Sequence, residues 1–203
     1  MRRATGGAAV LHQYERTYSL VAPLRSPTFP GGVVATYARV ARGLLIGLRS
    51  LGVPAQIAAE GGPSARQGSC FATVSAQEIA TPRGKLVGSA QLRRRGAFLQ
   101  HGSILLRADR SAWREALDDG GAAGGLTCLE EELERPIDPG ELDGALLHGL
   151  SAALGVEFVA AVAGPEERIA ATRLRAFKYL SANWTFRGRM PRRRSGAPGT
   201  KTR

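Results

Sequence analysis

The chain has 203 residues, of which 43% are hydrophobic and 22% charged, as in one ordinary globular domain or slightly more. No apolar run approaches the length of a bilayer span, which argues against a membrane protein. The formal net charge is +11, divided into a basic block at residues 1–110 (+11), an acidic block at 111–186 (−7) and a basic end at 187–203 (+7). Such a charge favours an acidic partner without distinguishing nucleic acid, lipid surface and protein.

The basic start of the chain, Met1–Gly7, has no apolar segment behind it, so we expect no signal peptide and a cytoplasmic protein. Two short strands are predicted between Ala8 and Val21, around a polar turn at residues 13–16. Apolar residues then recur at three- and four-residue spacing from Val33 to Leu51. This spacing predicts a helix that ends at Gly52.

The middle of the chain is predicted to be mostly strands. A strand at residues 53–58 precedes a Gly-rich loop, 60–69, that leads directly to Cys70. Short turns then separate three further strands, which are expected at residues 77–81, 85–91 and 97–106. Alternation along the second of these would put Lys85, Val87, Ser89 and Gln91 on one face.

After Asp109 the pattern becomes helical. Thr127 and Glu130 are spaced as a capping box that opens a short acidic helix. A longer helix is predicted to start at Asp138 and Pro139 and to end before Gly155, and another is predicted over residues 165–180. The fold class is therefore α+β, with a mixed sheet flanked by helices. We expect one catalytic domain over residues 1–186 and a disordered basic tail over 187–203.

Several residues could carry chemistry, and each also has a simpler structural explanation. The loop at Arg2–Gly7 could bring backbone N–H groups close to an anion, or it could be a solvated turn. Cys70 would be a nucleophile only as a thiolate, which a nearby ammonium such as Lys85 would favour, although a buried inert thiol is the commoner case. Only three of the 28 basic residues are lysines, so Lys85 fits a position that needs a compact ammonium.

Small residues inside two predicted strands, at 88–90 and 101–103, fit close approach by a ligand or tight packing about equally. The three histidines are too dispersed for a metal site, and no cluster has ligand spacing, so no metal is predicted. Two cysteines cannot build a disulfide framework, and both are expected to be reduced thiols.

Taken in order, six short segments resemble the lipoate–protein ligase and octanoyltransferase family, whose fold is shared with biotin–protein ligase catalytic domains. They are Arg2-Arg3-Ala4-Thr5-Gly6-Gly7-Ala8-Ala9-Val10-Leu11-His12, Thr17-Tyr18-Ser19, Cys70-Phe71, Gly84-Lys85-Leu86-Val87-Gly88-Ser89-Ala90-Gln91, Leu99-Gln100-His101-Gly102-Ser103-Ile104-Leu105-Leu106 and Lys178-Tyr179-Leu180-Ser181-Ala182-Asn183-Trp184-Thr185-Phe186. The Cys-Phe pair and the Gly-Ser-Ala-Gln strand are most similar to the cysteine-dependent bacterial octanoyltransferases. The resemblance implies that Cys70 carries the octanoyl group as a thioester and that Lys85 lowers the pKa of its thiol. The substrate-binding residues that it implies are Arg2, Arg3, Thr5, Gly6, Gly7, His12, Gly88, Ser89, Ala90, His101 and Gly102.

Two features depart from the family pattern. Ala8 stands where the family's glycine-containing loop usually continues with Gly or Arg. Family members also carry a strand and a helix before the Arg-Arg motif, whereas this chain begins at the motif. A start codon assigned too late is the favoured explanation, and a natural truncation is the alternative.

The leading hypothesis is a monomeric octanoyltransferase that needs no cofactor. Its donor would be acyl carrier protein, and its acceptor a lipoyl-domain protein such as glycine cleavage H protein or a 2-oxoacid dehydrogenase subunit. One alternative is an ATP- and Mg²⁺-dependent lipoate–protein ligase in which Cys70 is a bystander. Another is a truncated fragment that binds carrier or lipoyl domains without acylating them. Nucleic-acid binding is disfavoured because no aromatic residues interleave with the arginines.

Overall fold

The computed structural model describes residues 1–6, 9–58, 78–117 and 125–188. Its contacts divide the chain into two compact units. One unit is Gly7–Phe158, and the other combines Met1–Gly6 with Val159–Arg203. The division at Phe186 into a catalytic domain and a tail stays a prediction.

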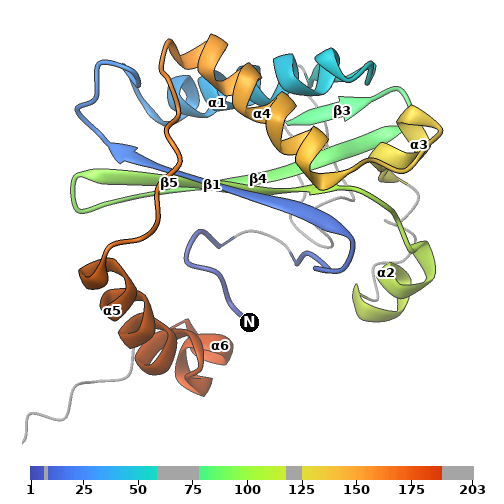
Figure 1. Cartoon of the computed structure of the whole chain (residues 1–203). Coiled ribbons are helices and arrows are strands. Elements are labelled where there is room, and N and C mark those ends of the chain that lie inside the picture. The colour runs from blue at the N-terminus through green and yellow to red at the C-terminus, as the bar shows by residue number, and fades with distance from the viewer. Residues whose placement is uncertain (7–8, 59–77, 118–124, 189–203) are drawn as a thin grey trace, which may run out of the picture. The chain divides into compact units, whose positions relative to one another are not determined.

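A five-stranded sheet forms the centre of the Gly7–Phe158 unit, with the order β1-β5-β4-β3-β2 and antiparallel pairing between neighbours. The only parallel pairing among the described residues is an isolated bridge between Lys85 and Leu126. β4 and β5 form a long hairpin (Figure 1). The strands are β1 (Glu15–Pro23), β2 (Gln56–Ile57), β3 (Ile79–Thr81), β4 (Gly84–Arg94) and β5 (Ala97–Leu105).

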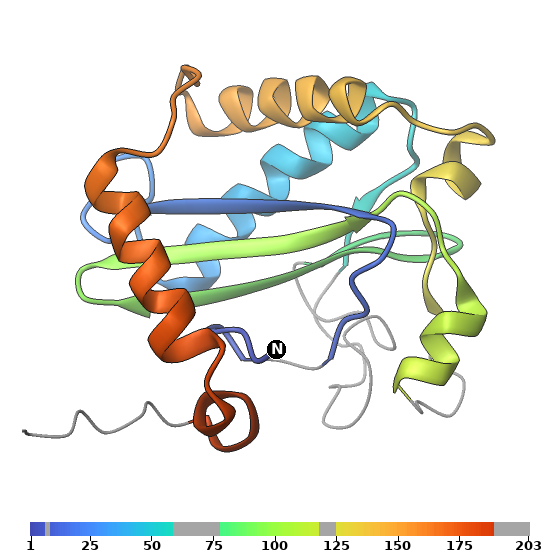
Figure 2. The same cartoon turned by 60° about the horizontal axis from the view of Figure 1, so that its bottom comes forward.

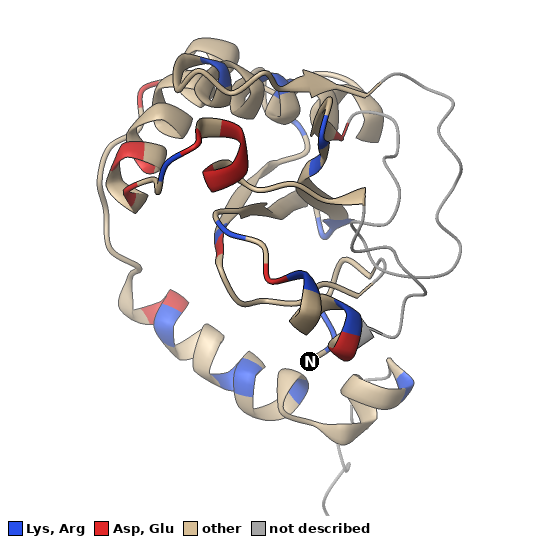
Figure 3. Cartoon of the chain, turned by 90° about the vertical axis from the view of Figure 1, so that its right-hand side faces the viewer, with Lys and Arg blue, Asp and Glu red and all other residues tan. Residues whose placement is uncertain are grey.

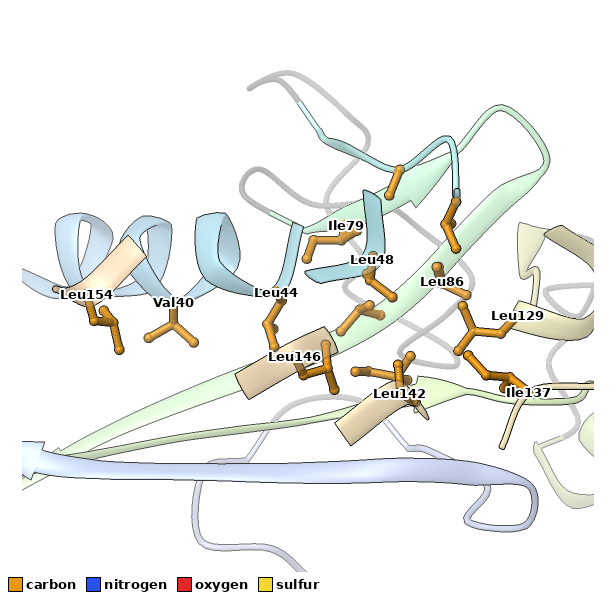
Figure 4. Packing of buried hydrophobic residues seen from close by; sticks show 14 of the residues in the cluster. Val40, Leu44, Leu48, Ile79, Leu86, Leu129, Ile137, Leu142, Leu146 and Leu154 are labelled. Carbon is orange, nitrogen blue, oxygen red and sulfur yellow. The ribbon is translucent and has the colours of Figure 1, made fainter. Parts of the chain in front are cut away.

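Two long helices, α1 (Val33–Ser50) and α4 (Pro139–Leu154), lie side by side on one face of this sheet (Figures 1 and 2). Both match the sequence-based expectation, including the Asp138 cap of α4, whose carboxylate accepts from the N–H groups of Gly140 and Glu141. The main hydrophobic core fills the space between helices and sheet. Figure 4 shows side chains of α1 meeting those of α4 there, among them Val40, Leu44, Leu48, Leu142, Leu146 and Leu154.

Two shorter helices, α2 (Arg110–Leu117) and α3 (Leu129–Leu133), complete this unit. The acidic first turn of α3 is the mostly red turn in Figure 3. A second, smaller core holds Leu105, Trp113, Leu126 and Cys128. Within the described residues, no helix is long and apolar enough to cross a membrane.

The second unit contains α5 (Pro165–Leu174), the π-helical turn η2 (Arg175–Tyr179) and α6 (Ala182–Arg187). The helix expected over 165–180 is therefore present, with its last turn wound as a π-helix. The ammonium of Lys178 lies 3.9 Å from the ring centroid of Trp184, in a cation–π contact between η2 and α6.

Two sequence-based expectations are wrong in detail. No strand occupies residues 9–14, and the chain enters β1 at Glu15, inside the expected turn, because β1 continues its pairing with β5 as far as Glu15–Leu105. Thr127 does not cap α3, which begins after Cys128. Its hydroxyl instead contacts the carboxylate of Glu132 at 2.6 Å, so the proposed capping-box pair with Glu130 does not form.

Candidate functional site

Lys85 is the most buried charged residue of the sheet and forms an ion pair with Glu78. The side chains are 1% and 8% exposed, and 2.7 Å separates the Lys85 Nζ from the Glu78 Oε2. The Lys85 carbonyl accepts a hydrogen bond from the Thr127 N–H at 3.0 Å. Sequence reasoning selected Lys85 and missed Glu78. One signal was available, because Glu78 is the single acidic residue between Glu60 and Asp109.

A β-bulge in β4 decides which way Lys85 faces. Ile79 pairs with Val87, but Ala80 pairs with Lys85, which leaves Leu86 as an extra residue in β4. Leu86 and Val87 both pack into the main core. Paired residues share a face of a sheet, so Lys85 lies on the face of Ala80, opposite to Val87. The expected alternation that put Lys85 with Val87, Ser89 and Gln91 is therefore wrong.

Three other predicted site residues share the face of Lys85. Gly88 and Ala90 alternate with the core-facing Val87, and Ala90 pairs with His101 of β5. This face lies opposite the one covered by α1 and α4 (Figure 2). The structure therefore brings Lys85, Gly88, Ala90 and His101 to one side of the sheet.

Ser89 and Gly102 belong to the opposite, helix-covered face. The Ser89 hydroxyl lies 2.7 Å from the Tyr18 hydroxyl, and the Ser89 carbonyl accepts from the Tyr37 hydroxyl at 3.3 Å. A Cβ on Gly102 would lie 2.7 Å from the Tyr18 ring, so glycine is needed for this close approach. Burial raises the pKa of Tyr18, which keeps its hydroxyl neutral and able to donate. Side-chain contact of Ser89 with a ligand on the Lys85 face is thus excluded by orientation.

Of the other predicted residues, only His12 belongs to the described part of the Gly7–Phe158 unit. Its ring Nδ1 lies 2.7 Å from the Glu15 carboxylate, which accepts the hydrogen bond, near the start of β1. Gly7 and Cys70 lie outside the described residues.

The Arg2–Gly6 segment belongs to the other compact unit. There the Arg3 side chain donates to the Gly6 carbonyl at 2.8 Å, and the Trp184 indole donates to the Arg2 carbonyl at 2.7 Å.

The second cysteine has the surroundings of an inert thiol. Cys128 is buried in the smaller core, and burial raises its pKa. A raised pKa leaves less thiolate at neutral pH, and the thiolate is the reactive form. Among the residues that the structure describes, no group of three or more His, Cys, Asp or Glu side chains could hold a metal ion.

Comparisons with known proteins agree with this architecture. The family model for the lipoyl protein ligase A/B catalytic domain matches residues 1–151. An octanoyltransferase LipM from Symbiobacterium thermophilum is 37% identical over 92% of this chain and 73% of its own length. The LipM of Carboxydothermus hydrogenoformans is 32% identical over the same shares.

Solved structures are similar in fold. A candidate lipoate protein ligase from T. acidophilum with bound lipoic acid gives a TM-score of 0.77 at 22% identity, covering 90% of this chain and 69% of that one. Lipoate-protein ligase A bound with ATP gives a TM-score of 0.71 at 20% identity, covering 83% of this chain and 63% of that one. These likenesses confirm the predicted fold of a sheet flanked by helices. The family model that matches residues 1–151 and the relative that is 37% identical over 92% of the chain show that the chain belongs to the lipoyl protein ligase A/B catalytic domain family.

Proposed function

We propose that this chain is a cytoplasmic octanoyltransferase that moves an octanoyl group from acyl carrier protein to a lysine of a lipoyl-domain protein. The observation that carries the proposal is the 37% identity to an octanoyltransferase over 92% of the chain. The buried Lys85 on β4 supports it, because a purely structural position would be filled at lower cost by an apolar side chain.

The reaction has two steps. The Cys70 thiolate attacks the carbonyl carbon of the carrier thioester, a new C–S bond forms, and the carrier leaves as its thiol after taking up a proton. The amine of the acceptor lysine then attacks the Cys70 thioester. A C–N bond forms, the C–S bond breaks, and the amine proton passes to the departing sulfur. Lys85 would stabilise negative charge on sulfur or on the carbonyl oxygen as it develops.

The partners follow from this chemistry. Acyl carrier proteins are typically acidic, and the first 110 residues carry a formal charge of +11. The acceptor would be a lipoyl domain, such as glycine cleavage H protein or a 2-oxoacid dehydrogenase subunit. A similar fold was solved as a bi-partite lipoate protein ligase together with its E2 lipoyl domain. The transfer needs neither a metal nor a nucleotide.

The acyl-enzyme can be tested by comparing serine variants of the two cysteines. Incubation with octanoyl–acyl carrier protein should add one octanoyl group to the protein, and hydroxylamine should remove it. Cys70→Ser should abolish the adduct. Cys128→Ser is the matched control and should leave the adduct unchanged, because burial holds the Cys128 pKa high. An adduct that survives in Cys70→Ser and disappears in Cys128→Ser would refute the assignment.

The same preparation distinguishes the alternative activities. Exchange of pyrophosphate into ATP that depends on free octanoate or lipoate, without carrier protein, would identify an ATP-dependent ligase. Binding of carrier or lipoyl domain without any adduct or amide product would identify a binding fragment. Either result would overturn the transferase proposal.

A further inference from the structure

The buried carboxylate of Glu78 is not used by the two-step reaction above. Glu78 immediately precedes β3, and Ala80, two residues later, pairs with Lys85 of β4. Residues two apart in a strand share a face, so the Glu78 and Lys85 side chains reach the same side of the sheet from neighbouring strands. Their 2.7 Å separation follows from this register.

This ion pair is costly to bury. Removing a carboxylate and an ammonium from water carries a desolvation penalty that their mutual attraction can fail to offset, and well-packed apolar residues of similar volume are often at least as stable. Stability alone therefore gives a weak reason for two charged residues at this position. Four apolar neighbours on the two strands, Ile79, Ala80, Leu86 and Val87, are buried without any such charge.

We propose that Glu78 is a positioning residue that holds the Lys85 ammonium at one fixed place on the face of the sheet opposite α1 and α4. The inference rests on the proposed acyl transfer for the step that benefits. A lysine side chain has four rotatable carbon–carbon bonds, and an ammonium that is held in place needs no reorganisation when charge develops beside it. Because the carboxylate offsets part of the positive charge, Lys85 then acts through the direction of its N–H donors more than through net charge.

Glu78→Gln is the most direct variant, because it keeps the size of the side chain and one oxygen acceptor while removing the charge. We expect kcat for octanoyl transfer to fall about 100-fold, as for a catalytic group displaced by roughly 1 Å. KM for the carrier should stay within about twofold, since the buried pair does not contribute to a docking surface. Glu78→Asp keeps the charge on a side chain one methylene shorter and should lie between wild type and Glu78→Gln.

Glu132→Gln is the matched control. Glu132 lies in α3, and its carboxylate accepts from the hydroxyls of Thr81, the last residue of β3, and Thr127 at 2.7 and 2.6 Å. The same change of charge there should leave kcat within about twofold of wild type. Far-UV circular dichroism and thermal unfolding of each variant would identify any loss of fold.

The NMR signal of the Lys85 ammonium reports its position without any substrate, because the chain has few lysines. Protein labelled with ¹⁵N-lysine has only three lysine ammonium groups, and Lys85→Arg assigns the signal of Lys85. A buried, ion-paired ammonium exchanges its protons slowly, so its N–H correlation should be visible in wild type and in Glu132→Gln. In Glu78→Gln it should broaden or shift markedly, and in Glu78→Asp it should do so partly.

The outcomes separate this inference from the proposed function. An unchanged Lys85 signal in folded Glu78→Gln and Glu78→Asp would overturn the positioning role, whatever the activity. A changed signal with unchanged kcat would overturn it as well, if Lys85→Ala abolishes transfer. Full transfer by Lys85→Ala would instead overturn the role of Lys85 in the reaction. A changed signal together with a kcat loss at constant KM would support the inference.

Discussion

The contact between α1 and α4 depends on Gly149, and a single methyl group there should disturb it. A Cβ on Gly149 would lie 2.3 Å from the Gly43 carbonyl oxygen and 2.4 Å from the Gly47 nitrogen. Both are backbone atoms of α1, so no side-chain rotation can relieve the overlap. To reach a contact of about 3.5 Å, the helices would have to separate by roughly 1 Å.

That separation sets the expected magnitude. It would loosen the packing of Leu44 and Leu146 in the main core, and inserting a methyl group into a well-packed interior costs about 1–3 kcal/mol. Gly144 lies in the same helix, and a Cβ there meets nothing within 4 Å. Gly144→Ala should therefore stabilise the protein by about 0.5–1 kcal/mol, through the higher helix propensity of alanine. The two variants should differ by about 1.5–4 kcal/mol.

Urea unfolding followed by circular dichroism would measure this difference. The midpoints should move in opposite directions at a common m-value. In thermal unfolding, 1 kcal/mol corresponds to about 2–4 °C for a chain of this size. If Gly149→Ala were as stable as Gly144→Ala, the two helices would not be in contact at Gly149, and the packing argument would fail.

Two further predictions concern surface charge. Arg94 and Arg95 are exposed at the β4–β5 hairpin, whereas Arg93 donates to Thr36 at 2.7 Å, so reversing only Arg94 and Arg95 should raise the carrier KM about threefold to tenfold at low salt. The effect should shrink as salt rises, and a salt-independent defect would mean that these arginines do not steer the partner. The second prediction concerns acid stability, because hydrogen bonding from Arg110 lowers the pKa of Glu131. The stabilisation is present above the unfolded pKa of about 4.3 and is lost as pH falls through the lower folded value, so Arg110→Ala should cost about 0.5 kcal/mol at neutral pH and little in acid. An equal loss at both pH values would assign the effect to packing.

The local sequence pattern was sufficient to predict those helices whose ends are marked by capping residues. Asp138 and Pro139 at the start of α4, and Gly155 at its end, fix the bounds of that helix by capping and by the left-handed backbone of the last residue. The apolar spacing from Val33 predicted α1 in the same way. The ordered motifs also selected Lys85, because a resemblance spread along the chain needs no knowledge of tertiary contacts.

Tertiary structure decided which side chains meet. The bulge at Leu86 turns Lys85 away from the face that strict alternation predicts, and Glu78 becomes its partner only because β3 pairs with β4 in that register. The orientation of Ser89 depends likewise on Tyr18, which is 71 residues away in the chain. A strand's own sequence specifies its period of two, but the pairing of strands sets its register and bulges. Non-local hydrogen bonds and core packing, which no local pattern records, therefore determined the environment of the candidate site.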